Sequence, residues 1–92
     1  MNNISDYSVG QTVYVKDRGG LIQEWVIVKI GRKYITARPR FKDEIWDTQF
    51  VQEPDRYNNH FIEKTNCDYS PRFIMYQSMQ EIKDEEEKLI LL

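Results

Sequence analysis

The sequence predicts a mainly β protein, a small β-barrel of about five strands followed by one C-terminal α-helix. Three observations favour this class. Residues 25–37 contain two arms rich in β-branched and aromatic residues on either side of Gly31 and Arg32, which is typical of a β-hairpin. Other short apolar segments alternate with turn residues, as in barrels of short strands. Ser78 followed by Glu81 is a capping box, which marks a helix start.

Length and composition favour one domain over residues 1–92. A chain of this size holds a single hydrophobic core, and 40% hydrophobic residues exceed what a disordered chain carries. We expect residues 1–8 to be frayed, because they offer few apolar anchors. Residues 9–76 are expected to form the barrel, and residues 77–92 the C-terminal helix with an apolar tail.

The first two strands are predicted from their side-chain patterns. Residues 9–16 alternate, which places Val13 and Val15 on one face. Residues 21–30 form the second strand and are nearly continuous in apolar residues after Trp25. This loss of alternation indicates a bulge or a strong bend, which small barrels need in order to close.

The third strand, residues 33–38, follows a predicted two-residue turn. Gly31 first in that turn suits the positive φ of a type II′ hairpin. Pro39 ends the strand, because proline cannot donate to a central ladder. The two predicted faces carry Ile35 and Ala37 on one side and Tyr34 and Thr36 on the other.

The remaining elements are shorter. A fourth strand is predicted at 45–51, followed by one or two short strands at 60–64 and 72–76. Turn-forming composition predicts loops at 41–44, 54–59 and 66–68. The helix is expected to span 79–89, with Ile82 on its apolar side.

The net charge of −2 is distributed unevenly along the chain. Residues 16–42 hold eight Lys or Arg against two acidic residues, a net charge of +6. Residues 43–92 hold five Lys or Arg against twelve acidic residues, a net charge of −7. The protein is therefore expected to present two surfaces of opposite sign.

Three segments, residues 9–15, 25–36 and 78–82, resemble the small SH3-like β-barrel proteins of phages and prophages of Gram-positive bacteria. The resemblance implies an SH3-like barrel and a mobile-element origin, and it implies little about activity because that family is mostly uncharacterised. The first strand and the hairpin are also similar to KOW-type barrels, which bind RNA, DNA or the transcription and translation machinery. Residues 39–71 carry no motif of either family.

The sequence indicates no catalytic centre. His60 and Cys67 are each the one residue of their kind, and we interpret them as a loop histidine and a half-buried cysteine. No Ser or Cys lies in a nucleophile motif, and the carboxylates of 84–87 point around a helix instead of converging on a metal. We therefore expect no enzymatic activity, no metal and no cofactor. One cysteine and the lack of a signal peptide or apolar span indicate the cytoplasm of a bacterial host.

Two candidate binding surfaces remain. The basic one comprises Lys29, Arg32, Lys33, Arg38, Arg40 and Lys42, interleaved with the aromatic residues Tyr14, Trp25, Tyr34, Phe41 and Trp46. Cations neutralise phosphates and exposed aromatics stack on bases. The alternative is that the cations only keep the strands soluble and the aromatics fill the core, which we favour for Trp25 and Trp46.

The second candidate surface is the acidic helix and its tail, represented by Asp84, Glu85, Glu87, Leu89 and Leu92. The acidic face suits a basic groove on a partner, although ordinary solubility explains the same residues. The apolar tail either folds against the barrel or serves in assembly.

The favoured hypothesis is a non-enzymatic phage or prophage protein, a host-takeover or anti-defence inhibitor of the anti-CRISPR type. Its partner would be a host protein or a protein–nucleic acid complex. A nucleic-acid-binding module of KOW or SH3-like type is the first alternative, and a structural homo-oligomer is the second.

Overall fold

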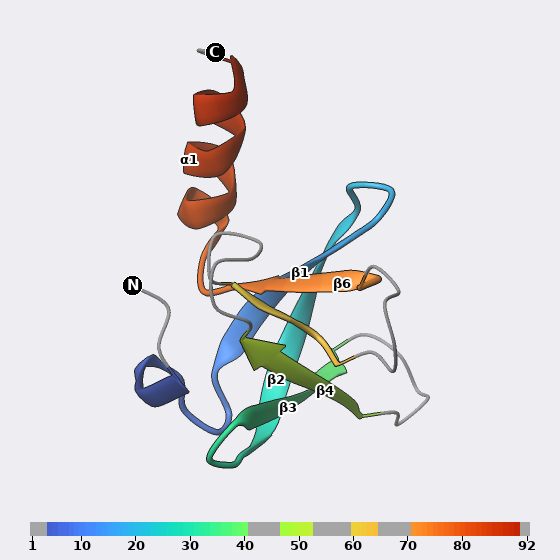
Figure 1. Cartoon of the computed structure of the whole chain (residues 1–92), viewed down its shortest axis with the longest axis vertical. Coiled ribbons are helices and arrows are strands. Elements are labelled where there is room, and N and C mark those ends of the chain that lie inside the picture. The colour runs from blue at the N-terminus through green and yellow to red at the C-terminus, as the bar shows by residue number, and fades with distance from the viewer. Residues whose placement is uncertain (1–3, 41–46, 53–59, 65–70, 91–92) are drawn as a thin grey trace.

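The computed structural model describes residues 4–40, 47–52, 60–64 and 71–90, with the backbone alone for 88–90. Within these residues the chain forms a short 3₁₀ helix, six strands and one α-helix (Figure 1). Their bounds are Ile4–Asp6 for η1, Thr12–Asp17 for β1, Ile22–Ile30 for β2, Tyr34–Pro39 for β3, Thr48–Gln52 for β4, Phe61–Glu63 for β5, Phe73–Tyr76 for β6 and Met79–Ile90 for α1.

The six described strands form one closed antiparallel barrel in sequence order, and β6 pairs with β1 to close it. The expectation of about five strands is therefore wrong, because both short segments after β4 become strands. β5 has only three residues, yet it pairs with β4 on one side and with β6 on the other. These pairings remove the two open edges that a sheet without β5 would expose.

Alternate residues of the strands point into the barrel and form its core, as a period of two requires. The buried members from the strands are Val13, Val15, Trp25, Ile27, Ile35, Ala37, Phe50, Phe61 and Met75. The predicted faces of the first and third strands are thus confirmed. Trp25 is a core residue, as predicted, and packs edge-on against Phe50 with ring centroids 5.8 Å apart. Trp46 lies outside the described residues.

The predicted irregularity in the second strand is a β-bulge. Ile27 pairs with Ala37, but Lys29 pairs with Thr36, so one extra residue of β2 lies between the two pairs. A bulge bends its strand and increases the local twist, which helps a small barrel close.

The connection between β2 and β3 differs from the predicted two-residue turn. Ile30 pairs with Ile35, and the N–H of Gly31 donates to the Tyr34 carbonyl at 2.9 Å, so Gly31 and Tyr34 flank Arg32 and Lys33 at the turn. The prediction of a positive φ at Gly31 is wrong, because Gly31 precedes the turn residues instead of being the first of them. The glycines with positive φ are Gly10, at 89°, and Gly20, at 86°.

Part of the N-terminal segment is tied to the core. Residues 1–8 are predicted to be frayed, but Ile4–Asp6 forms η1 and Tyr7 is buried. The Tyr7 ring meets Phe61 edge-on, with centroids 5.3 Å apart. An aromatic anchor of this size stabilises a terminus that otherwise has little apolar surface.

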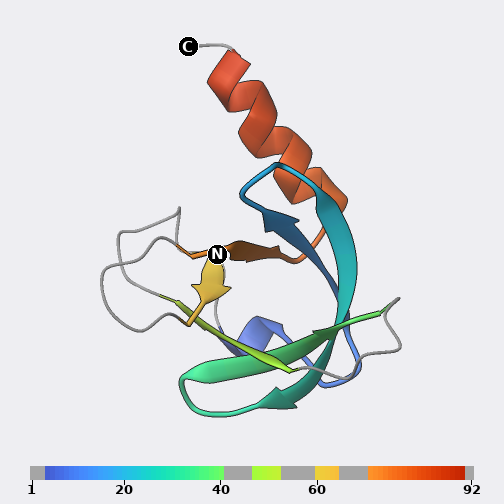
Figure 2. The ribbon, with the colours of Figure 1, turned by 90° about the vertical axis from the view of Figure 1, so that its right-hand side faces the viewer.

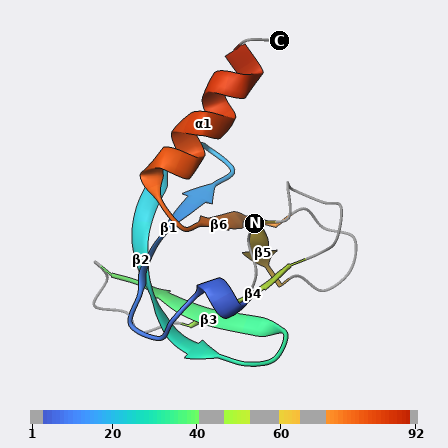
Figure 3. The same cartoon turned by 90° about the vertical axis from the view of Figure 1, so that its left-hand side faces the viewer.

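The helix α1 begins at the predicted cap. The Glu81 N–H donates to Ser78 Oγ at 3.2 Å, and the Glu81 carboxylate accepts from the N–H of Gln77, one residue before the cap. Ile82 is buried at the base of the helix. Beyond that base, α1 rises away from the barrel, at the opposite end of the molecule from the β2–β3 loop (Figures 2 and 3).

Candidate functional site

The cations predicted for the basic surface fall into two groups. The first group lies where β2 ends and the chain turns into β3, and it consists of Lys29, Arg32 and Lys33, all exposed. Within the described part of the chain, no hydrogen bond or ion pair holds Lys29 or Arg32. These two charges are therefore available to a ligand.

The second group lies at the far end of β3, and its charges are partly neutralised. Arg38 donates from Nε to Asp47 Oδ1 at 3.0 Å. Arg40 donates from Nη1 to Thr12 Oγ1 at 2.8 Å, and the same nitrogen is 3.9 Å from Glu24 Oε2. The structure thus separates these two arginines from the first group, although the sequence predicts one patch. Lys42 lies outside the described residues.

One aromatic side chain accompanies the exposed cations. Tyr34 lies on the outer face of β3, since its neighbour Ile35 points into the core, and its side chain is half-buried. Lys33 Nζ is 5.7 Å from the centroid of the Tyr34 ring, and Lys64 Nζ is 4.6 Å from it. Both distances are typical of cation–π contacts. Lys64 follows β5 and is brought here by the pairing of β4 with β3 and with β5.

The predicted acidic surface follows one side of α1. Asp84 and Glu87 are exposed, and Gln80 Nε2 donates to Asp84 Oδ1 at 2.9 Å. Glu85 is half-buried and faces the barrel, so it does not belong to the outward surface. The side chains of Leu89 and Leu92 lie outside the description, and the role of the apolar tail stays a prediction.

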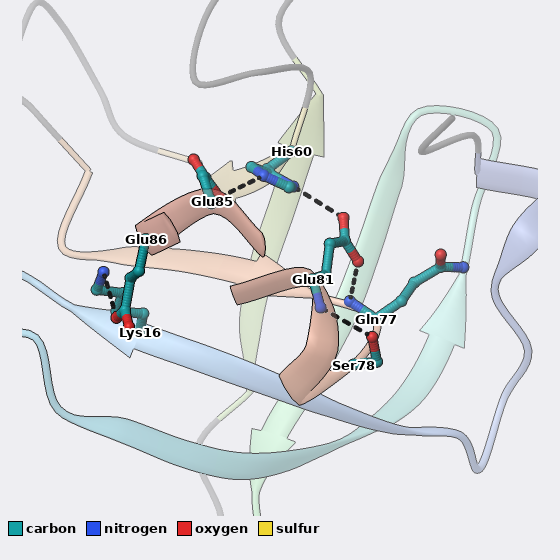
Figure 4. Close-up of polar contacts among 7 residues, drawn as sticks. All are labelled: Lys16, His60, Gln77, Ser78, Glu81, Glu85 and Glu86. Carbon is teal, nitrogen blue, oxygen red and sulfur yellow. Dashed lines mark hydrogen bonds and ion pairs between the residues drawn. The ribbon is translucent and has the colours of Figure 1, made fainter. Parts of the chain in front are cut away.

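The base of α1 carries a polar cluster that the sequence does not predict (Figure 4). His60, at the start of β5, is buried between two carboxylates of the helix. Its Nδ1 is 3.4 Å from Glu81 Oε1, and its Nε2 is 3.1 Å from Glu85 Oε2. On the other side of α1, Lys16 Nζ is 3.7 Å from Glu86 Oε1. The cluster therefore fixes α1 to the barrel from two directions.

Tyr76 completes this cluster. Its ring centroid is 4.3 Å from that of His60. Burial raises the pKa of Tyr76 above its ordinary value, and the charges of Glu85, Glu81 and Glu86 raise that pKa further. The phenol is therefore neutral at physiological pH and acts as a hydrogen-bond donor.

The described residues contain neither a metal-binding cluster nor a membrane-spanning helix. No group of three or more His, Cys, Asp or Glu side chains within them is arranged to hold a metal ion. No helix in that part of the chain has the length and apolar character that crossing a membrane requires.

The sequence matches a known protein family. Residues 1–91 match the family described as the phage ProQ C-terminal-like domain. The chain belongs to this family. No curated protein and no solved structure matches it. Membership in this family supports the phage association that the sequence resemblance implies.

We interpret His60 from the sequence as a loop histidine and predict neither its contacts nor those of Lys64, which the fold creates. Lys64 directly follows β5 and is exposed, whereas Ile62 within the strand is buried. Its contact with Tyr34 depends on the pairing of β4 with β5. For His60 no local signal exists, because its partners lie on a helix distant in sequence.

Proposed function

We propose that this phage-associated domain acts by binding and not by catalysis, and that its β2–β3 loop contacts nucleic acid. The observation that supports this most is the exposure of Lys29, Arg32 and Lys33 together, away from the acidic helix. Cations placed in this way displace the counterions of a phosphate backbone, which is the main source of sequence-independent affinity. The likeness to SH3-like and KOW-type barrels, the latter of which bind RNA or DNA, agrees with this function.

Charge reversal at the loop tests the proposal. Arg32→Glu is expected to weaken binding of a short fluorescent oligonucleotide by about five- to tenfold near 0.1 M salt, because one phosphate contact becomes repulsive. Fluorescence anisotropy from about 50 to 200 mM salt gives the slope of the logarithm of the binding constant against the logarithm of the salt concentration. The magnitude of this slope should be smaller by about 0.7–0.9 in the variant.

The matched control is Lys83→Glu, which makes the same charge change at an exposed position of α1. Its affinity should stay within about twofold of the unmodified protein, because only distant and screened charge is altered. Equal losses in the two variants would contradict a localised site, as would the absence of binding at low salt.

A second candidate is the host-takeover or anti-defence inhibitor, of anti-CRISPR type, that acts on a host protein or nucleoprotein complex. The observation that favours it is the projection of α1 from the barrel with Asp84 and Glu87 exposed. A projecting acidic helix is complementary to a basic groove, including one that nucleic acid otherwise fills. Family membership fits this candidate as well, because the domain is phage-associated.

A further inference from the structure

We propose that Tyr34 is a stacking platform for an unpaired base, so that the nucleic acid bound by this domain is single-stranded. The inference rests on the proposed function of the β2–β3 loop and specifies its ligand. Its basis is the convergence of one outward aromatic ring and two lysines from separate elements, two residues after the exposed Arg32.

The backbone fixes the position of the Tyr34 ring. Tyr34 is the first residue of β3, and its carbonyl accepts the N–H of Gly31 at 2.9 Å. Across the barrel surface it pairs with Val51 of β4. A ring anchored on a strand loses little conformational freedom when a base stacks on it, which favours binding.

The two lysines are placed to follow the backbone of a bound strand. Lys33 belongs to the loop, whereas the backbone N–H of Lys64 donates to the Gln49 carbonyl at 2.8 Å, which anchors its stem beside β4. Their ammonium groups lie 5.7 and 4.6 Å from the Tyr34 ring centroid. Base stacking on an aromatic ring is stronger than an exposed cation–π contact. A base therefore displaces a flexible lysine from the ring, and the ammonium group moves to a phosphate.

This arrangement distinguishes single strands from duplexes. In a duplex each base is already stacked between its neighbours, and a ring on the convex surface of a barrel cannot reach a base face. In a single strand the bases are free to turn toward Tyr34 while Arg32 and Lys29 contact phosphates. Stacking needs only a π face, so the site takes single-stranded RNA or DNA with little sequence preference.

The test uses the whole chain and three labelled probes of equal length, namely single-stranded RNA, single-stranded DNA and a DNA duplex. Tyr34→Val, which suits a strand, is expected to lower single-strand affinity by about tenfold, because a stacked base is lost. Tyr34→Phe keeps the ring and should bind as the unmodified protein does. The salt slope should be unchanged in Tyr34→Val, in contrast to Arg32→Glu, because no phosphate contact is removed.

The outcomes separate the two proposals. Duplex binding as tight as single-strand binding, with no effect of Tyr34→Val, would overturn the stacking inference and leave the basic loop intact. Failure of all three probes to bind at low salt would overturn both proposals. Equal losses in Tyr34→Val and Tyr34→Phe would also overturn the inference, because stacking needs only the ring. Thermal unfolding of both variants shows whether a loss of affinity reflects a loss of folding. If Tyr34→Val does not fold, the affinity of Tyr34→Phe is the deciding measurement.

Discussion

Glu63 is a buried carboxylate that depends on one arginine. Its side chain is 7% exposed, and the Arg72 backbone N–H and guanidinium both donate to it, with Arg72 Nη2 2.6 Å from Glu63 Oε2. Burial acts to raise the pKa of Glu63, but the hydrogen bonds and charge of Arg72 outweigh it and hold that pKa below its ordinary value. The pair thus converts a costly buried charge into a stabilising one.

Replacement of Arg72 should change how the free energy of unfolding depends on pH. Arg72→Met is expected to lower the free energy of unfolding by about 2 kcal/mol at pH 7, less than for a fully buried pair because Arg72 is 59% exposed. The pKa of Glu63 is lower in the folded protein than in the unfolded chain, where it is about 4.3, so the ionised carboxylate stabilises the fold above that pH. This stabilisation is lost as the pH falls through the pKa of Glu63 in the folded protein. The difference between the two proteins should therefore shrink below about pH 4.

Denaturant unfolding at several pH values measures this difference. Arg32→Met serves as the matched control, because Arg32 is exposed and has no hydrogen bond or ion pair within the described residues. Its stability should follow that of the unmodified protein at every pH. A constant difference for Arg72→Met from pH 7 to pH 3 would show that packing, and not the carboxylate, explains the loss.

At the scale of elements, α1 depends on contacts at its base. Both ring nitrogens of His60 face carboxylate oxygens, Nδ1 that of Glu81 and Nε2 that of Glu85. Tyr76 lies against the same ring. Among the described residues, the titratable groups beside His60 include Glu81 and Glu85 from the helix and Tyr76 from β6.

His60→Leu should loosen α1 while the barrel stays folded. Leucine fills much of the same buried volume but donates no hydrogen bond, so the helix loses two contacts to carboxylates. Amide hydrogen exchange of residues 81–87 is expected to become about tenfold faster, and exchange in β2 and β3 should be unchanged. Lys83→Gln, at an exposed position, is the control and should change neither. Equal acceleration in the helix and the barrel would mean that His60 supports global stability.

Some features of the elements follow from local sequence patterns, and others depend on pairing between strands. The inward residues Val13, Val15, Ile35 and Ala37 and the cap at Ser78 are predictable, because alternation and capping are local. The turn at Gly31 is mispredicted because the register of β2 against β3, set by the bulge, is a pairing between strands.

The candidate sites are less predictable than the fold. Arg38 and Arg40 look equivalent to Arg32 in the sequence, but the fold gives them Asp47 and Thr12 as partners. Conversely, the pairing of β4 with β3 and β5 brings Lys64 to the Tyr34 ring. Such contacts join segments distant in sequence, and no local pattern of charge or hydrophobicity records them.

At the scale of the whole molecule, the two charged surfaces lie at opposite ends of an axis 39 Å long (Figure 1). The β2–β3 loop forms the basic end and α1 the acidic end. Exposed charges are screened over about 8 Å at physiological ionic strength, so the two ends act independently. A change at one end should leave binding at the other end unaltered.

This independence allows one experiment to separate the two proposed functions. The tagged protein is used to capture partners from a bacterial lysate, with and without nuclease, alongside Arg32→Glu and the double variant Asp84→Lys/Glu87→Lys. If the basic end binds nucleic acid, the captured partners are lost with nuclease and with Arg32→Glu, and the double variant retains them. If α1 binds a host protein, that protein survives nuclease and is lost only with the double variant, because reversed charge repels a basic groove. A partner that survives nuclease and both variants would exclude both charged ends as its binding surface.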